Sequence, residues 1–370
     1  MSGAGAILTV NAGSSSLKLR LLGPGDEVLA ARDAAPGDDA TALRDELRRM
    51  LSGAPAPDAA AHRVVHGGAA FTGPTVVDAG VEGELERLAE LAPLHNPQAV
   101  RAMRALEEAA PGLVNVACFD TAFHADLPAA ASTYALPAAW SGGDTPLRRY
   151  GFHGLSHAYA ARRAAELLGA AVEDLRLVTA HLGAGASLAA VAAGRSVDTT
   201  MGFTPLEGLV MATRAGSVDP GLLLWLQRHR GIAAEEMERA LDREAGLLGL
   251  AGTADMREVL ARAGRGEKRA GLALDVYLHR LVAAIATMAA AMGGLDALVF
   301  TGGIGENAAT VRHRACAAAG FLGVSLDPAL NERGEGDSVL SPAGAMAAVL
   351  LVSAREDLEM ARQTRALLGG

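Results

Sequence analysis

The feature that most constrains the fold is a strand–turn–strand unit that occurs twice. Residues 177–192 read LVTAHLGAGASLAAVA, two short apolar runs joined by a Gly-Ala-Gly turn, which predicts a hairpin. Residues 7–22, ILTVNAGSSSLKLRLL, repeat the arrangement around a small polar turn from Asn11 to Ser16. Two such units about one domain length apart indicate an internal duplication. A chain of 370 residues also exceeds what one core usually supports, so we expect two domains.

The turn at 183–185 is a candidate phosphate site. Small residues let backbone N–H groups approach an anion closely. On its own a Gly-rich hairpin is more often just a tight turn, and this spacing fits neither a Walker loop nor a dinucleotide fingerprint. The polar residues that follow strengthen the interpretation, because they need partners: Asp198, Thr199, Thr200, Thr204, Glu207, Arg214, Ser217 and Asp219.

A third Gly-rich turn, FTGGIGEN at 300–307, follows the apolar run LDALVF and precedes a helical pattern. A strand, a Gly-rich turn and then a helix is the arrangement that places a ligand at a helix N-terminus. We therefore expect two phosphate-facing hairpins and a nucleoside-side turn around one cleft.

Composition excludes several other classes. A net charge of −9 argues against general nucleic-acid binding, which depends on Lys and Arg neutralising phosphates. The chain has no run of about 18 uncharged apolar residues and no basic-then-apolar N-terminus, so we expect no membrane span or signal peptide, and a cytoplasmic location. Cys118 and Cys316 lie far apart in apolar sequence, which favours buried free thiols over a disulfide.

Three polar residues stand out before the central hairpin. Arg63 enters the strand HRVVHGG beside two histidines and two glycines, which suggests a cationic edge on the cleft rather than a solvated surface arginine. Asp120 ends the strand VACFD, where open α/β sheets place ligand groups, although it could simply cap a turn. His153 precedes a helix that runs to Leu168 and could donate to an anion; a packed core histidine is the competing interpretation.

Helical patterns cover much of the remaining chain. An amphipathic helix ends near Ser52 after a loop that begins at Arg32, and further helices are predicted at 82–91, 97–109, 222–230, 235–243, 267–292 and 358–368. The long helix at 267–292 places five apolar residues on one side, as core or subunit interface: Leu272, Val276, Leu281, Ile285 and Met288. At GTADMREV, sequence alone favours Asp255 as a helix N-cap and Arg257 as a surface cation.

Taken in order, the motifs resemble those of acetate kinases, a family within the actin, Hsp70 and sugar kinase fold group. The strings NAGSSSLKLRL, HRVVHGG, APLHNP, FDTAFH, YGFHGLSH, HLGAGASL, DTTMGFTPLEGLVMATRAGSVDPG and FTGGIGEN cover nearly the whole chain. The resemblance implies an α/β fold of two duplicated ribonuclease H-like domains around a central cleft. Residues 1–149 with the C-terminal helix 357–370 would form an acyl-substrate and phosphate domain, and residues 150–356 a nucleotide-binding and dimerisation domain.

The resemblance also implies a reaction, the transfer of a phosphoryl group from ATP to acetate. The alternative within the family is a propionate or other short-chain carboxylate kinase. Arg63 and Arg214 would flank the transferring group, His153 would donate to it, and Asp120 would orient the carboxylate or the neighbouring arginine. His153 and Arg214 would thereby stabilise the transition state. An apolar pocket for the acyl group would be formed by Val65, Leu94, Phe152 and Pro205.

The resemblance also implies which residues bind the nucleotide and the metal ion. Mg²⁺, with Mn²⁺ as an alternative, would be organised by Asn11 and Glu356. Ser14, Ser16, Lys18, His181, Gly183 and Gly185 would line the phosphate path. The adenosine side would be formed by Asp255, Met256, Arg257, Gly303, Ile304, Gly305 and Asn307. The implied partners are ATP or ADP, acetate or acetyl phosphate and a second copy of the chain, with no nucleic acid and no membrane.

The sequence departs from the family pattern at one position, and two other protein classes are alternatives to this interpretation. Where the family usually has Asn in HLGNG, this chain has Ala184, which removes a side-chain donor next to the phosphates, so we expect weaker nucleotide handling. A sugar kinase relative would share the fold but needs a catalytic base for its hydroxyl acceptor. A nucleotide-binding module of the Hsp70 kind would be expected to carry a peptide-binding segment.

Overall fold

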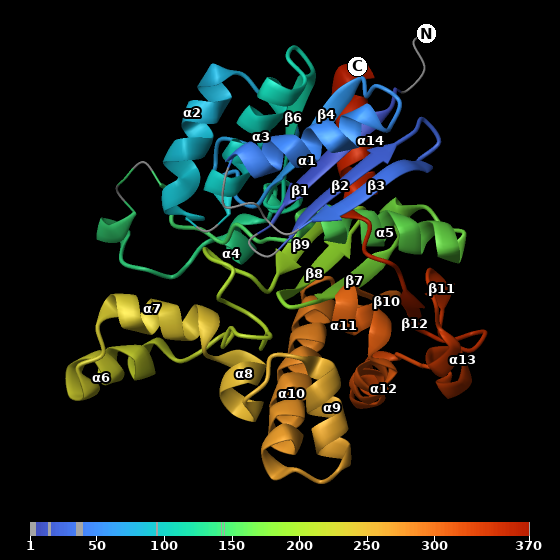
Figure 1. Cartoon of the computed structure of the whole chain (residues 1–370). Coiled ribbons are helices and arrows are strands. Elements are labelled where there is room, and N and C mark those ends of the chain that lie inside the picture. Colours follow the sequence, from blue (N-terminus) through green and yellow to red (C-terminus); the bar gives the residue numbers. More distant parts are fainter. Residues whose placement is uncertain are drawn as a thin grey trace.

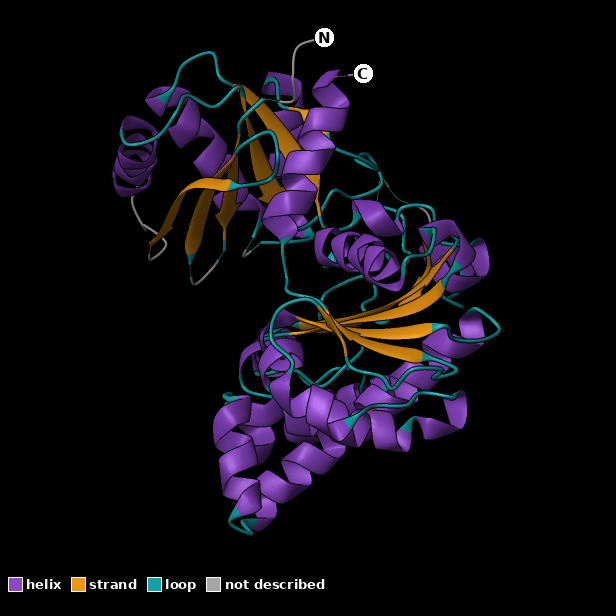
Figure 2. Cartoon of the chain, turned by 90° about the vertical axis from the view of Figure 1, so that its right-hand side faces the viewer, coloured by secondary structure: helices purple, strands orange, loops and turns teal. Residues whose placement is uncertain are grey.

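The computed structural model describes residues 5–13, 16–34, 40–93, 95–141, 143 and 145–369, and contains two six-stranded sheets. The first sheet is formed by β1 (Ile7–Ala12), β2 (Leu17–Leu22), β3 (Val28–Ala34), β4 (Ala59–Val64), β5 (Thr75–Val76) and β6 (Val114–Phe119). The second is formed by β7 (Arg176–Leu182), β8 (Ala186–Ala192), β9 (Arg195–Thr199), β10 (Ala297–Thr301), β11 (Ser338–Val339) and β12 (Ala348–Leu351). One sheet lies above the other in the molecule (Figure 2).

The two sheets have the same topology. Their strand orders are β3-β2-β1-β4-β6-β5 and, read from the corresponding edge, β9-β8-β7-β10-β12-β11. The pairing directions match as well, since β1 and β7 each pair antiparallel with the next strand and parallel with β4 and β10 respectively. The duplication predicted from the two hairpins is therefore confirmed.

Helices cover the faces of both sheets (Figure 1). In the first half these are α1 (Ala40–Ser52), α2 (Ala79–Arg87), α3 (Asn96–Ala109) and α4 (Ala129–Ser132). The later helices are α5 (Gly154–Leu168), α6 (Pro220–Arg230), α7 (Ala234–Arg243), α8 (Gly246–Ala251), α9 (Met256–Gly264), α10 (Lys268–Ala291), α11 (Gly302–Asn307), α12 (Ala309–Ala318), α13 (Pro328–Arg333) and α14 (Glu356–Gly369). Short 3-10 segments lie at Leu88–Glu90, Ala122–His124, Ala138–Trp140, Val172–Asp174 and Gly320–Leu322.

Strand alternation decides which helix covers which face of the second sheet. Leu177, Ala189 and Val191 share a face that packs on α5, whereas Val178 and Leu188 point to the opposite face, which packs on α10. The first sheet is closed differently, because α14 returns from the end of the chain to cover the face that contains Ile7 and Cys118. Its other face packs on α1 and α3.

Several helix predictions are confirmed to within a few residues, but the structure corrects others. Residues 32–34, predicted as the start of a loop, belong to β3, and β9 also adds a strand beyond the second hairpin. Both strands carry charged, partly exposed residues, so they lack a clear apolar signal. The stretch 302–307 is itself the helix α11, and not a turn before the next helix. Gly302 makes this possible, because its φ of 78° turns the chain directly out of β10.

The long helix α10 has the predicted apolar content, but one of the residues predicted on its apolar side is exposed. Leu281, Ile285 and Met288 are buried, but Leu272 is 59% exposed. The buried stripe at this end runs instead through Ala270, Ala273 and Leu274. By length and composition alone α10 could cross a membrane, but it packs against β7, β8, α9 and α12, as the core helix of a globular fold does. Both cysteines are buried free thiols, as predicted.

Candidate active site

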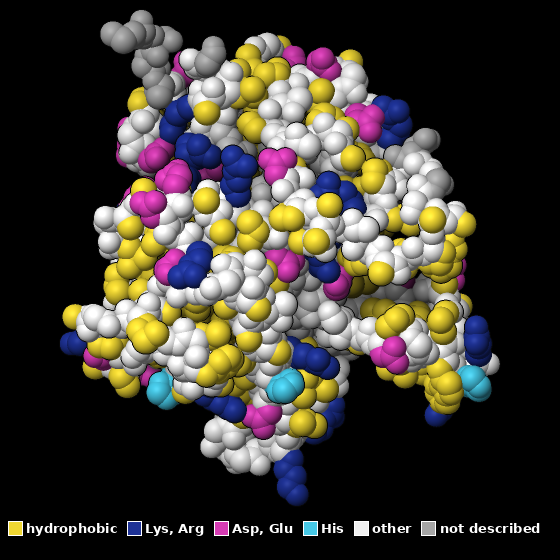
Figure 3. Space-filling view, turned by 180° about the vertical axis from the view of Figure 1, so that it is seen from behind, with side chains coloured by type: hydrophobic (Ala, Val, Ile, Leu, Met, Phe, Trp, Pro, Cys, Tyr) yellow, Lys and Arg dark blue, Asp and Glu magenta, His cyan; other side chains and the backbone are white. Residues whose placement is uncertain are grey.

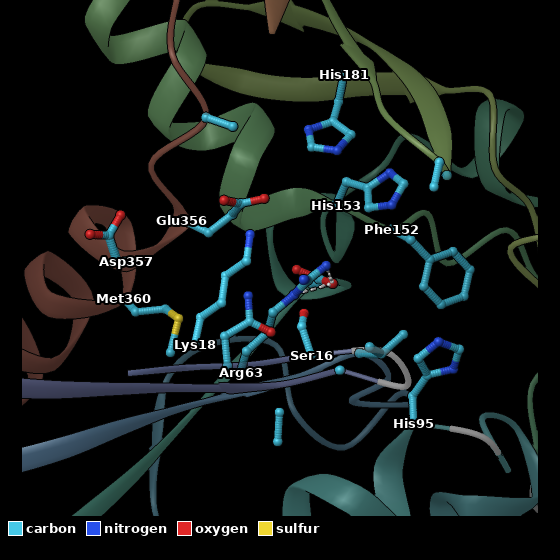
Figure 4. Close-up of a pocket in the computed structure, with 18 of the residues that line it drawn as sticks. Ser16, Lys18, Arg63, His95, Phe152, His153, His181, Glu356, Asp357 and Met360 are labelled. Atoms are coloured by element: carbon cyan, nitrogen blue, oxygen red, sulfur yellow. Dashed lines mark hydrogen bonds and ion pairs between the residues drawn. The ribbon is translucent and has the colours of Figure 1, made fainter. Parts of the chain in front are cut away.

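A cavity of about 490 Å³ lies at the junction of the two halves and collects most of the predicted site residues. It is lined by strand ends and turns of both sheets and by the start of α14 (Figure 4). The predicted residues in its wall are Asn11, Ser16, Lys18, Arg63, Val65, Asp120, Phe152, His153, His181, Ala184, Gly185, Pro205, Arg214 and Glu356, whereas Gly183 is not part of the wall. Leu94 and Ser14 lie outside the described residues, so their predicted positions stay untested.

Arg63 on β4 forms a partly buried ion pair with Asp120, which directly follows the adjacent parallel strand β6. Arg63 donates through Nε and Nη2 to Oδ2 of Asp120, at 3.0 and 2.7 Å. Burial lowers the pKa of Arg63, but Asp120 and Glu356 outweigh it, and the pKa lies above its usual range. Burial raises the pKa of Asp120, and Arg63 opposes the rise. Asp120 therefore orients the arginine, one of the two predicted alternatives, and Arg63 keeps Nη1 for a ligand.

Arg214 reaches the same cavity from the other half of the molecule. Its Nε donates to Oδ1 of Asp242 on α7, at 2.6 Å. A Cβ placed on Gly185 would lie 3.7 Å from Nη1 of Arg214 and 3.3 Å from Nε2 of His153. Because Gly185 has no Cβ, a guanidinium, an imidazole and the backbone of the 183–185 turn face one small space.

His153 occupies this space through an unusual backbone conformation. Its φ is 56°, in the left-handed region that non-glycine residues rarely adopt and that costs on the order of 1–3 kcal/mol. The backbone N–H of Gly154 donates to the carbonyl of Asp120 at 2.8 Å, which ties the start of α5 to the end of β6. A side chain at Gly154 would clash with that carbonyl, since its Cβ would lie 2.3 Å from the oxygen. The strained residue thus holds its ring in the cleft.

The His153 ring stays neutral because of its surroundings. It stacks on the His181 ring with centroids 4.5 Å apart. Burial lowers the pKa of His153 well below its ordinary value, and His181, Arg63, His157 and Arg214 lower it further. Its Nδ1 lies 2.9 Å from Oγ of Ser187. A neutral imidazole can donate from one nitrogen only, which makes the tautomer decisive.

The apolar end of the cavity contains Val65, Phe152 and Pro205, as predicted. Phe152 is 1% exposed and packs edge-on against the buried ring of His66. His95 also lines this end, and burial, with Arg214 and Arg63, lowers its pKa to about 4. A neutral histidine beside apolar side chains leaves room for a small group without adding a cation.

The opposite end of the cavity contains oxygen atoms that could bind a metal ion, and a lysine. Asn11, Ser16 and Lys18 come from the first hairpin, and Glu356 starts α14. Lys18 extends toward the Glu356 carboxylate (Figure 4). Burial raises the pKa of Glu356, but Arg63 and His181 outweigh it, so the carboxylate stays ionised.

This donor set suits Mg²⁺. An amide and a carboxylate are hard oxygen ligands, and Mg²⁺ is commonly held by few protein oxygens together with water and substrate phosphates. Within the described ranges no group of three or more His, Cys, Asp and Glu is placed to hold a metal. The residues therefore fit a cation that a phosphate ligand helps to bind, and not a closed protein cage.

The residues predicted for the adenosine side lie outside the cavity wall. Gly303, Ile304, Gly305 and Asn307 form α11, whose first residue abuts β7: a Cβ on Gly302 would lie 2.9 Å from the carbonyl of Leu182. This places α11 next to the turn that begins at Gly183. Asp255 caps α9 and pairs with the exposed Arg257, while Met256 is buried, as the N-cap interpretation predicts. Their predicted contact with adenosine stays a prediction.

The structure adds several residues that were not predicted for the site. His95, Thr9, Arg20, Arg355, Asp357 and Met360 line the cavity. Asp242 bonds Arg214 and Ser187 bonds His153, and the His157 ring and Thr179 extend the second contact inward, since His157 bonds Ser187 and Thr179 bonds His157. The sequence signals for the last group are the four-residue spacing of His153 and His157 and single hydroxyls in otherwise apolar strands.

Comparison with known proteins decides the family. The model of the acetokinase family matches residues 42–362. The chain belongs to the acetokinase family. An acetate kinase from Synechococcus sp. is 50% identical over 310 residues, covering 84% of this chain and 76% of the relative. Acetokinase enzymes are phosphotransferases with a carboxyl-group acceptor, and the chain is one of them.

Solved structures of acetokinases share the whole fold. The acetate kinase of Porphyromonas gingivalis superposes with a TM-score of 0.89 at 35% identity, covering 99% of this chain and 100% of that one. A propionate kinase from Francisella tularensis gives 0.87 at 34% identity, covering 97% and 98%. The predicted fold of two similar α/β domains of the actin, Hsp70 and sugar kinase group is thereby confirmed, and a sugar kinase or chaperone-like module is not favoured.

Proposed function

We propose that the chain transfers the γ-phosphoryl group of ATP directly to acetate, giving acetyl phosphate and ADP, and that the reaction is reversible. The observation that carries the proposal is that His153 and Arg214 face the space beside Gly185 in a cavity that Arg63 also lines. Three donors from both halves of the molecule suit a phosphoryl group between two oxygens. Family membership supports a carboxylate as the acceptor.

The site contains what this reaction requires. An ionised carboxylate is already a nucleophile, so catalysis reduces to alignment and to neutralising charge on the transferring group. Arg63 and Arg214 supply fixed positive charge, each oriented by its own carboxylate partner, Asp120 or Asp242. His153 donates a hydrogen bond without adding a charge. No covalent enzyme intermediate is needed.

Acceptor and nucleotide would occupy opposite ends of the cavity. The methyl group of acetate packs against Val65, Phe152 and Pro205, with Leu94 as the further wall that the family resemblance implies. The phosphates of ATP extend along Lys18, His181 and the 183–185 turn, and adenosine reaches toward α11 and the start of α9. Asn11 and Glu356 hold Mg²⁺, which when bound neutralises phosphate charge.

A hydroxamate assay tests the proposal. The protein is incubated with ATP, Mg²⁺ and acetate, and acyl phosphate is trapped by hydroxylamine. We expect acetyl hydroxamate from the native chain and at least a thousandfold less from Arg63→Ala, since charge-stabilising arginines in phosphoryl transfer contribute on the order of 10³-fold or more. No hydroxamate with any acid of two to four carbons would reject the kinase function.

Propionate is a second candidate substrate. Val65, Phe152 and Pro205 supply apolar contacts at the proposed methyl position, and each additional methylene gives an apolar pocket only about 1–3 kcal/mol of discrimination. The structural likeness to a propionate kinase also favours this candidate. Acetate and propionate should both react, whereas hydroxy and dicarboxylic acids should be rejected, because Val65, Phe152 and Pro205 offer no hydrogen bond to a second polar group.

We also propose a cytoplasmic homodimer formed through the second half of the chain. Helix α6 supports this, because it has no buried residue of its own and exposes Leu222, Leu224 and Trp225 at 45–51%. The unit of α6 and α7 projects from the body, and hydrophobic side chains gather on it (Figure 3). Light scattering should give twice the monomer mass at micromolar concentration; a monomer would overturn the dimer and leave the catalytic proposal intact.

A further inference from the structure

A chain of hydrogen bonds runs from the interior of the second half to His153. Oγ1 of Thr179 lies 2.8 Å from Nδ1 of His157, whose Nε2 lies 2.8 Å from Oγ of Ser187. Ser187 in turn lies 2.9 Å from Nδ1 of His153. Thr179, His157 and Ser187 are all 0% exposed, so water does not replace any of these bonds.

The fold itself brings the four residues together. Thr179 on β7 and Ser187 on β8 point to the same sheet face, because Thr179 pairs with Ala189 and His181 pairs with Ser187 in the antiparallel register. That face is covered by α5. His157 lies one helical turn after His153, and its backbone N–H donates to the His153 carbonyl at 2.9 Å. Both rings therefore meet Ser187 from the same helix start.

A Ser187 hydroxyl that accepted from both rings would leave its own buried proton without a partner among the described residues. When Ser187 donates to one of the rings, the chain can be polarised in two directions only, since each neutral imidazole has one donor and one acceptor nitrogen. In one direction Thr179 donates to His157, His157 donates to Ser187, Ser187 donates to Nδ1 of His153, and the His153 proton is on Nε2. In the other direction every bond is reversed, and Nε2 of His153 is left as a bare lone pair. Thr179 would then donate to the Ala189 carbonyl, which lies at the longer distance of 3.5 Å.

The cleft distinguishes the two directions. Nε2 of His153 faces the turn at Gly185 and the side chain of Arg214. Phosphoryl oxygens are acceptors, so a bare lone pair at this position would repel them. An N–H there would donate. Burial lowers the pKa of both His157 and His153 well below the ordinary value. A doubly protonated ring is therefore unfavourable, and each ring is one of the two neutral tautomers.

We propose that Thr179, His157 and Ser187 are positioning residues that hold His153 as the neutral tautomer with its proton on Nε2, aimed at the transferring phosphoryl group. The inference rests on the proposed role of His153. This positioning role explains why polar side chains are buried in an otherwise apolar contact between the sheet and α5, where each unpaired polar group would lower the stability of the fold. It also makes Thr179, at the far end, the group that sets the polarity.

Nitrogen-15 NMR of histidine-labelled protein tests the assignment directly, because long-range N–H couplings distinguish the two tautomers. The His153 signals are identified by their loss in His153→Gln. We expect the native protein to show the proton on Nε2. In Ser187→Ala, the fixed tautomer should be lost and kcat should fall on the order of tenfold or more, with the KM for acetate unchanged.

Matched variants separate positioning from general damage to the core. Ser196→Ala removes an equivalent buried bond, from Ser196 Oγ to Nδ1 of His124 at 2.7 Å, which lies outside the chain, and should alter neither the His153 tautomer nor kcat. Thr179→Val should behave like Ser187→Ala, and Thr179→Ser, which keeps the hydroxyl, should restore native values. The two Thr179 variants also test the inference if Ser187→Ala does not fold.

The outcomes are distinct. A native His153 that carries its proton on Nδ1 overturns the inference, as does a tautomer that is unaffected by both Ser187→Ala and Thr179→Val. If the tautomer responds as expected but His153→Gln retains native kcat, the positioning chain stands and the proposed role of His153 in catalysis fails.

Discussion

Each of the two cleft arginines that we propose as catalytic is paired with its own carboxylate. Arg63 is held by Asp120 and Arg214 by Asp242, and among the described residues Nη1 of neither arginine has another partner. Holding one edge of a guanidinium leaves the other edge ready for a ligand and reduces the side-chain entropy lost on binding. This arrangement makes the effects of single substitutions predictable.

We predict that Ala184 weakens nucleotide binding, because it lacks the side-chain donor of the Asn that the family resemblance implies. The side chain is exposed in the cavity wall, so a larger group can be added without a clash. Ala184→Asn should lower the KM for ATP about tenfold, since a hydrogen bond to a charged group contributes about 1.5–3 kcal/mol. Ala184→Leu, of similar size but without a donor, is the control. Equal KM values for native, Asn and Leu proteins would contradict the expectation.

We predict that Val65, which lines the cavity, limits the depth of the proposed acyl pocket. Val65→Ala should shift the ratio of kcat/KM for propionate over acetate upward by roughly tenfold, equivalent to about 1.4 kcal/mol. The ratio is measured with both acids under the same conditions. If it stays constant while Arg63→Ala abolishes turnover, the phosphoryl site is right and the pocket assignment is wrong.

At the scale of elements, α7 supports the proposed catalytic Arg214 through Asp242. Asp242 lies near the end of this helix and holds Arg214, and Asp242 and Arg214 side chains are each only 20% exposed. Asp242→Ala should free the guanidinium and lower kcat on the order of tenfold, with little change in thermal stability. Glu238→Ala on the same helix is the control. An unchanged kcat in Asp242→Ala would show that Arg214 needs no support.

The sequence predicted the secondary-structure elements better than it predicted the contacts between side chains. The two hairpins and most long helices were predicted because their apolar periodicity is local. Strands β3 and β9 were missed, since charged and half-exposed residues carry little strand signal. Most of the cavity wall followed from motif resemblance. The pairs of Arg214 with Asp242 and of His157 with Ser187 did not, because each joins residues about 30 apart in sequence through packing alone.

At the scale of the whole molecule, buried neutral histidines predict sensitivity to acid. Burial lowers the pKa of His62, His66 and His124 to about 4, against 6.5 for an unburied ring. Between these values the unfolded chain binds more protons than the folded one, so the free energy of unfolding falls as the pH drops from 6.5 to 4. Each such histidine contributes about 2 kcal/mol of this loss by pH 5.

Urea unfolding of His124→Gln at pH 7 and pH 5 checks this prediction. The variant should lose about 2 kcal/mol less than the native protein between the two conditions. The exposed histidine variant His229→Gln should show the native pH dependence. Identical losses for all three proteins would exclude His124 as a contributor.

The position of the cleft between two duplicated halves predicts that the halves approach each other on binding. Closure would exclude water from the transferring group. Small-angle scattering with ADP, Mg²⁺, acetate and a planar phosphoryl mimic should show a smaller radius of gyration than the free protein. ADP alone is the comparison, and an unchanged radius with the full set would count against closure.

The return of α14 to the first sheet has a consequence for synthesis on the ribosome. Ile7, Ala59 and Cys118 face water until Met360 and Ala361 arrive to cover them, and by then the second sheet is already complete. Domains generally fold as they emerge, and exposed apolar surface makes partly folded chains prone to aggregation. The first half of this chain is therefore translated first but finishes folding last, and any ribosome pause before residue 356 leaves an open hydrophobic sheet face that a chaperone would recognise.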